Sequence, residues 1–152
     1  MDKSPLNSLP ICQVALVVRD IERTARAFAE VFGMEVPAVR VTETADQTQI
    51  RYRGRPTAGR AKLAFFQMGQ VSLELIEPFG GPSTWQEALD AHGEGVHHIA
   101  FRVGNMKETL AFLESRKIPV VQTGEFKGGR YAYVDSHPAL KVLLELLETD
   151  RR

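Results

Sequence analysis

The chain has 152 residues, of which 43% are hydrophobic, enough for one domain with a substantial core. Lys and Arg together number 19, as do Asp and Glu, so the formal net charge is zero and the composition predicts no nucleic-acid partner. The single cysteine, Cys12, excludes an internal disulfide and a cysteine-based zinc site. No apolar run approaches the ~20 residues of a membrane span, and the N-terminus lacks the apolar core of a signal peptide. We therefore expect a cytoplasmic protein without a membrane partner.

The first half of the chain has the pattern of a strand, a helix and further strands. Residues 1–9 form a polar leader that we expect to be flexible, and the first module is expected at 10–78. A β-branched run at 11–18 predicts a buried strand. Asp20 then occupies a helix N-cap position, and Gly33 is expected to end the helix because glycine tolerates the left-handed conformation.

The segment 36–59 is polar and is expected to form one or two exposed strands and a mobile loop. Arg51, Arg53 and Arg55 alternate in this segment, so one strand face would carry three guanidinium groups. Such a face suits an anionic ligand, and it equally suits a solvated sheet edge that discourages aggregation.

A hairpin completes the first module and places Glu74 on the same strand face as Phe65. Residues 79–94 are expected to be a linker with a short helix, which a capping box at 84–87 would open. The second module, expected at 95–149, repeats the order of a strand, a capped helix and three further strands.

Two strand-forming stretches of the chain are nearly copies of each other. An offset of 85 residues lays Gln13 on His98 and matches the following VALVV with IAFRV. An offset of 71 residues lays Glu74 on Glu145, each within a leucine-containing strand pattern. A repeat at a fixed offset predicts two half-domains with equivalent positions.

Four side chains are polar exceptions on mostly apolar strand faces, since alternate residues of a strand share a face: Gln13, Glu74, His98 and Glu145. Burying two carboxylates is costly unless they are protonated, paired with cations or bound to a metal. An amide oxygen, an imidazole nitrogen and two carboxylate oxygens suit a divalent ion such as Zn, Co, Ni, Mn or Fe. Taken singly, these residues also fit an exposed edge Glu or a core His.

The chain resembles the vicinal oxygen chelate superfamily, which includes glyoxalase I, methylmalonyl-CoA epimerase, extradiol dioxygenases and bleomycin-resistance proteins. The resemblance covers about residues 11–148, and its carriers are QVALVVRD at 13–20, LELIEP at 73–78, GVHHIAFRV at 95–103 and VLLELL at 142–147. ELIEP and HHIAFRV are especially similar to the epimerase branch. The resemblance implies an α+β fold, in which two βαβββ modules form a cupped mixed sheet with helices on its outer face.

The resemblance also places the ligands of one divalent metal ion on four positions of this chain: Gln13, Glu74, His98 and Glu145. Gln13 breaks the two-histidine set of extradiol dioxygenases, and the intact ligand set separates the chain from bleomycin-binding relatives. One form of glyoxalase I has the same set, but Val17 and Pro78 stand where that enzyme contacts glutathione. Epimerases usually have His at the first ligand position and a further acid–base Glu near 57–60, where this chain reads TAGR.

Proton transfer at the carbon next to a carbonyl group is the reaction that these residues best support, because a divalent ion stabilises charge that develops on the carbonyl oxygen. We expect Glu145 to remove the proton, with Glu74 acting from the opposite side. The expected contacts to a small, anionic substrate are Phe65, Arg102 and Arg53. The predicted function is a metal-dependent isomerase or epimerase. The alternatives are a glyoxalase I-like lyase acting on a thiol adduct and a non-catalytic small-molecule-binding protein, and a homodimer is expected from the resemblance.

Overall fold

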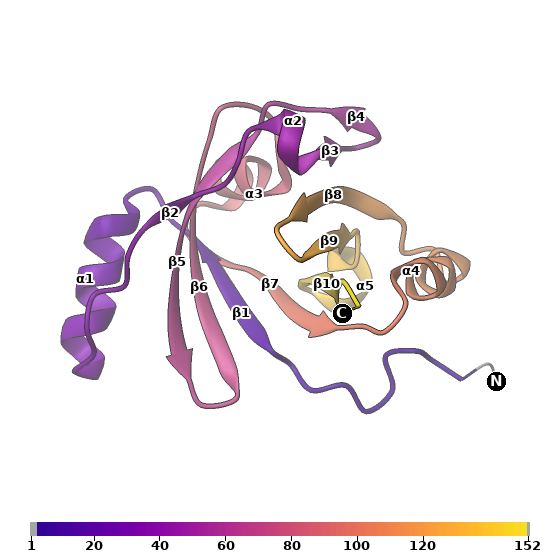
Figure 1. Cartoon of the computed structure of the whole chain (residues 1–152), viewed down its shortest axis with the longest axis horizontal. Coiled ribbons are helices and arrows are strands. Elements are labelled where there is room, and N and C mark those ends of the chain that lie inside the picture. Colours follow the sequence, from indigo (N-terminus) through magenta and orange to yellow (C-terminus); the bar gives the residue numbers. More distant parts are fainter. Residues whose placement is uncertain (1–2, 152) are drawn as a thin grey trace.

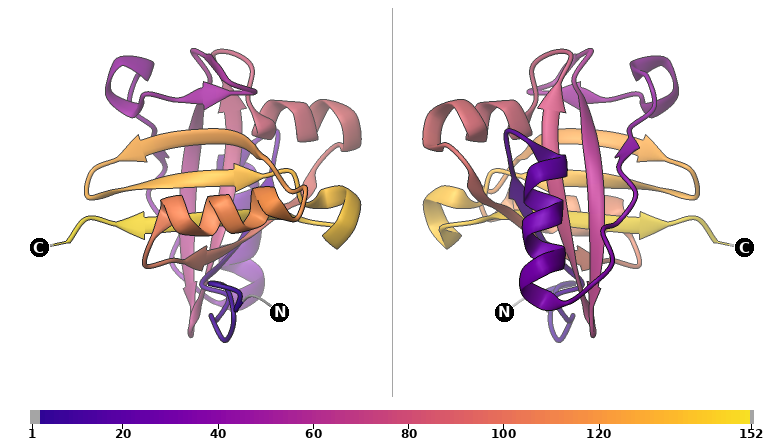
Figure 2. Two further views of the ribbon diagram at one scale, coloured as in Figure 1. Left: turned by 90° about the vertical axis from the view of Figure 1, so that its right-hand side faces the viewer. Right: turned by 90° about the vertical axis from the view of Figure 1, so that its left-hand side faces the viewer.

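The predicted strands all belong to one curled ten-stranded sheet, seen in Figure 1 and, from two sides, in Figure 2. The computed structural model describes residues 3–151. The elements of the first half are β1 (Gln13–Val17), α1 (Ile21–Phe32), β2 (Arg40–Val41), α2 (Ala45–Thr48), β3 (Arg51–Tyr52), β4 (Arg55–Pro56), β5 (Arg60–Met68) and β6 (Val71–Phe79). Those that follow are α3 (Thr84–His92), β7 (Gly95–Arg102), α4 (Met106–Ser115), β8 (Val120–Phe126), β9 (Gly129–Val134), α5 (His137–Leu140) and β10 (Leu143–Thr149). Within residues 3–151 no helix combines the length and apolar character needed to cross a membrane.

The two halves of the sheet join edge to edge within one chain. The strand order is β2-β5-β6-β1-β7-β10-β9-β8-β3-β4. β1 is parallel with β6 and antiparallel with β7, and β7 is parallel with β10. In each half the first strand therefore lies beside the last one, as a repeated module requires. The predicted α+β fold with a cupped mixed sheet is confirmed.

The two longest helices, α1 and α4, cover the outer side of the sheet. The Asp20 carboxylate accepts a hydrogen bond from the Arg23 amide at the start of α1, and Gly33 ends the helix with a φ of 64°. Asn105 caps α4 in the same way. Apolar residues of α1 pack on the first half of the sheet and those of α4 on the second half, which leaves the inner side of the sheet for the site.

The helix between the halves, α3, packs on the inner side of the sheet instead. Its apolar residues Trp85 and Leu89 belong to the inner core cluster. The N-cap is Ser83, whose hydroxyl accepts from the Gln86 amide, so the predicted capping box that began at Thr84 is wrong. Thr84 is already the first helical residue and therefore cannot cap the helix.

The segment 36–59 crosses from the first half of the molecule to the second. β3 and β4 form a tight hairpin around Arg53 and Gly54, and β3 pairs with β8 of the second half. The expectation that three arginines share one strand face is wrong, because the chain reverses direction at Arg53, which has a φ of 52°. The Arg51 guanidinium donates a hydrogen bond of 2.8 Å to the Gly54 carbonyl, and this bond stabilises the reversal.

The N-terminal segment 3–9, expected to be a flexible leader, contacts the second half of the molecule. Its two leucines, Leu6 and Leu9, are partly buried and pack against the core cluster beneath α4. The Leu9 amide donates to the Leu6 carbonyl, so these residues form a turn. This segment therefore adds apolar contacts to the outer face of the sheet.

Candidate metal centre

The four predicted ligands lie on four neighbouring strands at the middle of the sheet. Glu74 is on β6, Gln13 on β1, His98 on β7 and Glu145 on β10, and these strands are consecutive in the sheet. The residues next to the two carboxylates pack on the outer side, in the clusters beneath α1 and α4. Because side chains alternate along a strand, the carboxylates are directed to the inner side.

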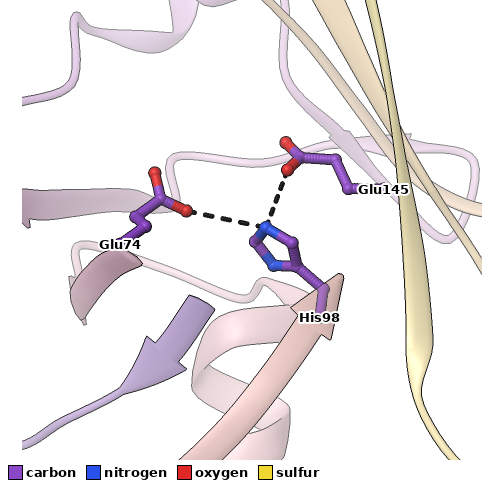
Figure 3. Close-up of side chains that lie close together, drawn as sticks. All are labelled: Glu74, His98 and Glu145. Carbon is purple, nitrogen blue, oxygen red and sulfur yellow. Dashed lines mark ion pairs between the residues drawn. The ribbon is translucent and has the colours of Figure 1, made fainter. Parts of the chain in front are cut away.

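Three oxygen atoms surround one imidazole nitrogen, His98 Nε2. Glu145 Oε2 lies 2.7 Å from this nitrogen, Gln13 Oε1 lies 3.0 Å away and Glu74 Oε1 lies 3.6 Å away. Figure 3 shows the two carboxylates directed toward the imidazole from two sides. The structure therefore brings together all four residues that the sequence singled out, from strands far apart in the chain.

The ionisable groups of this cluster are almost fully buried. The exposed fraction is 7% for Glu74, 5% for Glu145 and 0% for His98. Burial raises the pKa of Glu145 to about 8, with the Tyr133 hydroxyl acting in the opposite direction. Burial, together with the charge of Glu145, also raises the pKa of Glu74 well above its usual range. Burial lowers the pKa of His98 to about 3, so its imidazole is neutral and keeps a lone pair for a ligand.

The buried oxygen Glu145 Oε2, which lacks a hydrogen-bond partner within residues 3–151, indicates that these residues fit a metal ion. This oxygen is buried and has no hydrogen-bond partner among the described residues, although His98 Nε2 is only 2.7 Å away. Single donor atoms of Glu74, His98 and Glu145 all lie within 4.8 Å of one another. Two ligands at about 2.1 Å from one tetrahedral ion are about 3.4 Å apart, so a divalent ion would satisfy these donors after small side-chain shifts.

A cavity of about 300 Å³ lies beside Gln13 and contains two of the three predicted substrate contacts. Phe65 and Arg102 line this cavity together with Gln13. Arg102 is exposed and Phe65 is half-buried, so the cavity offers a cation and an aromatic ring next to Gln13, one of the predicted metal ligands. A guanidinium group at this position suits an anionic group of a small molecule.

The sequence matches the family model of the Glyoxalase/Bleomycin resistance protein/Dioxygenase superfamily over residues 12–134. The chain belongs to this superfamily. A relative from Bacillus subtilis (strain 168), Uncharacterized protein YqjC, is 34% identical over 92 residues. That match covers 59% of this chain and 66% of the relative, which is just under two thirds of its length.

Solved structures with the superfamily fold resemble this chain along nearly its whole length. The hypothetical protein BH1468 from Bacillus halodurans C-125 has a TM-score of 0.68 at 19% identity, covering 96% of this chain and 98% of that one. Methylmalonyl-CoA epimerase from Mycobacterium tuberculosis has a TM-score of 0.65 at 20% identity, covering 99% and 93%. A variant of the Streptomyces coelicolor epimerase in complex with 2-nitronate-propionyl-CoA has a TM-score of 0.63 at 20% identity, covering 95% and 100%. At these identities the likeness concerns the fold, and the resemblance seen in the sequence is confirmed.

Arg53, the third predicted substrate contact, lies away from this cavity. Its Nη2 is 2.7 Å from Glu87 Oε1, in an ion pair between the β3–β4 hairpin and α3. Arg53 lines a different cavity, of about 490 Å³, next to α3. Because the chain reverses direction at Arg53, the structure does not bring this residue together with Phe65 and Arg102.

His97 is a buried residue of the site that strand alternation did not predict. Ala15 of β1 pairs with His98, and Leu16 pairs with Val96. His97 is therefore the extra residue of a β-bulge in β7. As a result both imidazoles contact Tyr133, with ring centroids 5.1 and 5.0 Å away. The adjacent histidines were visible in the sequence, but strict alternation placed His97 on the outer face.

Proposed function

We propose that this protein is a divalent-metal-dependent isomerase or epimerase that transfers a proton at the carbon next to a carbonyl group or acyl thioester. The observation that carries the proposal is the pair of buried carboxylates, Glu74 and Glu145, whose oxygens face one nitrogen of His98. A divalent ion held by these residues and Gln13 would supply a Lewis acid for the substrate carbonyl oxygen. The likeness in fold to methylmalonyl-CoA epimerases supports an acyl thioester as the substrate class.

Glu145 is the proposed base, and Glu74 is its partner on the opposite side of the reacting carbon. Burial favours the protonated form of both carboxyl groups in the metal-free protein, whereas a bound ion would favour their ionised form, and a group that removes and returns a proton needs access to both forms. Trp85 donates a hydrogen bond to the Tyr133 hydroxyl at 2.9 Å and fixes an aromatic wall beside the imidazole. This wall limits contact of bulk water with the carboxylates and lowers the polarity around the reacting carbon.

Replacing Arg102 with Ala is expected to raise the KM for an anionic substrate by about 10- to 100-fold and to change kcat little. A charge-assisted hydrogen bond that binds substrate and transition state equally has this effect. Steady-state kinetics of Arg102→Ala, with Arg51→Ala as an exposed arginine outside the cavity, would measure it. An unchanged KM in Arg102→Ala would remove Arg102 from substrate binding.

The second candidate is a lyase of the glyoxalase I type that acts on a thiol adduct. The ligand set of one glutamine, one histidine and two glutamates favours this alternative, since one form of glyoxalase I uses the same set. Val17 stands at a position that contacts glutathione in that enzyme, and here it is 1% exposed within the inner core. A thiol other than glutathione is therefore the substrate expected under this alternative. The homodimer expected from the resemblance stays a prediction.

Solvent deuterium exchange distinguishes three possibilities from one another: the isomerase or epimerase, the lyase and a non-catalytic binding protein. The protein, stripped with EDTA and reloaded with zinc, cobalt or nickel, would be incubated in D₂O with 2-carboxyacyl-CoA thioesters, and separately with hemithioacetals of several thiols. The proposed function predicts metal-dependent deuterium incorporation at the carbon next to the thioester. Turnover of a hemithioacetal alone would favour the lyase. Binding without exchange or turnover in any metal form would contradict both enzymes.

A further inference from the structure

The metal-binding role proposed for His98 requires one particular tautomer of its ring. A neutral imidazole carries one proton and binds a metal through the other nitrogen. The oxygens of Gln13, Glu74 and Glu145 surround Nε2, so Nε2 must be the nitrogen without a proton. The proton of His98 must then be on Nδ1, where a hydrogen-bond acceptor is needed because the ring is 0% exposed.

His97 provides the acceptor at that position. His97 Nδ1 lies 2.8 Å from His98 Nδ1, so the two nitrogens share one hydrogen bond and only one of them carries the proton. If His98 donates, His97 accepts and its own proton is on Nε2. If His97 donates instead, the proton of His98 moves to Nε2 and occupies the lone pair that a metal ion needs.

The surroundings of the two rings hold this contact in place. The β-bulge turns both residues to the same side of β7, and the rings meet edge to face at a centroid distance of 5.0 Å. Tyr133 packs against both, and His97 is only 3% exposed. His97 Nε2 has no hydrogen-bond partner among the described residues, and His97 lines the 490 Å³ cavity next to α3.

We infer that His97 is a positioning residue, whose Nδ1 accepts the Nδ1 proton of His98 and thereby keeps His98 Nε2 free for a divalent cation. The inference rests on the proposed function only in assuming that the four ligands hold a metal. This role also accounts for the bulge. In a regular strand the adjacent residues His97 and His98 would lie on opposite faces of the sheet, and the bulge brings both imidazoles to the same face.

Metal affinity of matched variants tests the inference. His97→Phe keeps a ring of similar shape but removes the acceptor, whereas His97→Asn keeps an acceptor, and His92→Phe changes an exposed histidine on α3. Competition with a chelator should show zinc binding about 10- to 100-fold weaker in His97→Phe, as is typical when the partner of a ligating histidine is lost. His97→Asn should lose less affinity than His97→Phe, and His92→Phe should match the wild type.

A spectroscopic measurement on the wild type makes the test independent of whether His97→Phe folds. Long-range ¹H–¹⁵N NMR of the zinc-loaded protein should show His98 protonated on Nδ1 and His97 protonated on Nε2. A proton on His97 Nδ1, or wild-type zinc affinity in folded His97→Phe, would overturn the inference while leaving the metal site in place. A wild-type protein that binds no zinc, cobalt or nickel would instead overturn the metal site itself, and the positioning role with it.

Discussion

Replacing Glu145 with Gln is expected to reduce proton exchange at the substrate carbon by about 10²- to 10⁴-fold, the usual contribution of a general base. Gln keeps the side-chain length and one oxygen that can bind a metal, but it cannot accept a proton from carbon. Bound metal, measured after gel filtration, should therefore stay close to one ion per chain. Exchange rates of metal-loaded Glu145→Gln and wild-type protein would be compared by mass spectrometry in D₂O.

Glu74→Gln is the matched variant, because Glu74 is the equivalent residue of the other half and faces the same imidazole. If Glu145 is the base, Glu74→Gln should slow the return of a proton to the opposite face more than it slows proton removal. Epimerisation would then fall further than deuterium exchange. Exchange in metal-loaded Glu145→Gln within about 3-fold of the wild type would exclude Glu145 as the base.

Without metal, the protein is expected to lose stability as the pH rises from 6.5 to 8. An unfolded Glu is ionised throughout this range, whereas burial raises the pKa of Glu145 to about 8 in the folded protein. The folded state therefore binds more protons than the unfolded state, and its free energy of unfolding falls by about 1.4 kcal/mol per pH unit for each such group. Glu145 alone would account for about 2 kcal/mol over this range. Burial lowers the pKa of His98 to about 3 and that of His97 well below its usual range, so both are neutral in the folded protein. An unfolded His is about half protonated at pH 6.5, so each of the two adds about 0.4 kcal/mol of stability between pH 6.5 and 8 and offsets part of the loss.

Metal binding should remove this pH dependence, because the ion binds the deprotonated carboxylates and replaces their protons. Urea unfolding at pH 6.5 and pH 8, followed by the fluorescence of the single tryptophan, Trp85, would measure both forms with EDTA or with zinc. Glu145→Gln without metal should show a smaller loss, and Glu125→Gln, at an exposed position of β8, should behave as the wild type. A metal-free wild type as stable at pH 8 as at pH 6.5 would contradict the raised pKa of Glu145.

Much of the site was predictable from the order of residues. The fixed-offset repeat paired Gln13 with His98 and Glu74 with Glu145, and all four side chains meet at His98 Nε2. Their convergence could be foreseen because each residue is a polar exception on an apolar strand face, and the direction of a side chain follows from its parity along a strand. Helix caps are equally local. Asp20 caps α1 as predicted, and the capped helix predicted for the second module is α4, with Asn105 as its N-cap, whereas the cap of α3 is one residue before the predicted Thr84.

The differences at Arg53 and His97 have a common physical origin in contacts between residues that are distant in the chain. Arg53 was expected on a continuous strand with its neighbours, but the chain reverses there and β3 pairs with β8 of the other half. His97 was not singled out as a site residue, and its place on the inner side follows from a bulge that pairing with β1 inserts at that residue. The bulge is not marked by a distinctive sequence, because it depends on which strand becomes the neighbour. The reversal is marked only by Gly54, a glycine at a position of positive φ, amid arginines that alternate as in a strand.

The printed sequence was sufficient to specify the repeated order of strand and capped helix and the strand faces that carry the proposed ligands, since these depend on short-range alternation and capping. It did not specify that β1 and β7 join the halves within one chain, that Phe65 and Arg102 share a cavity with Gln13, or that His97 contacts His98. Those features follow from hydrogen bonds between strands, which link residues far apart in the chain and exist only once the sheet has formed.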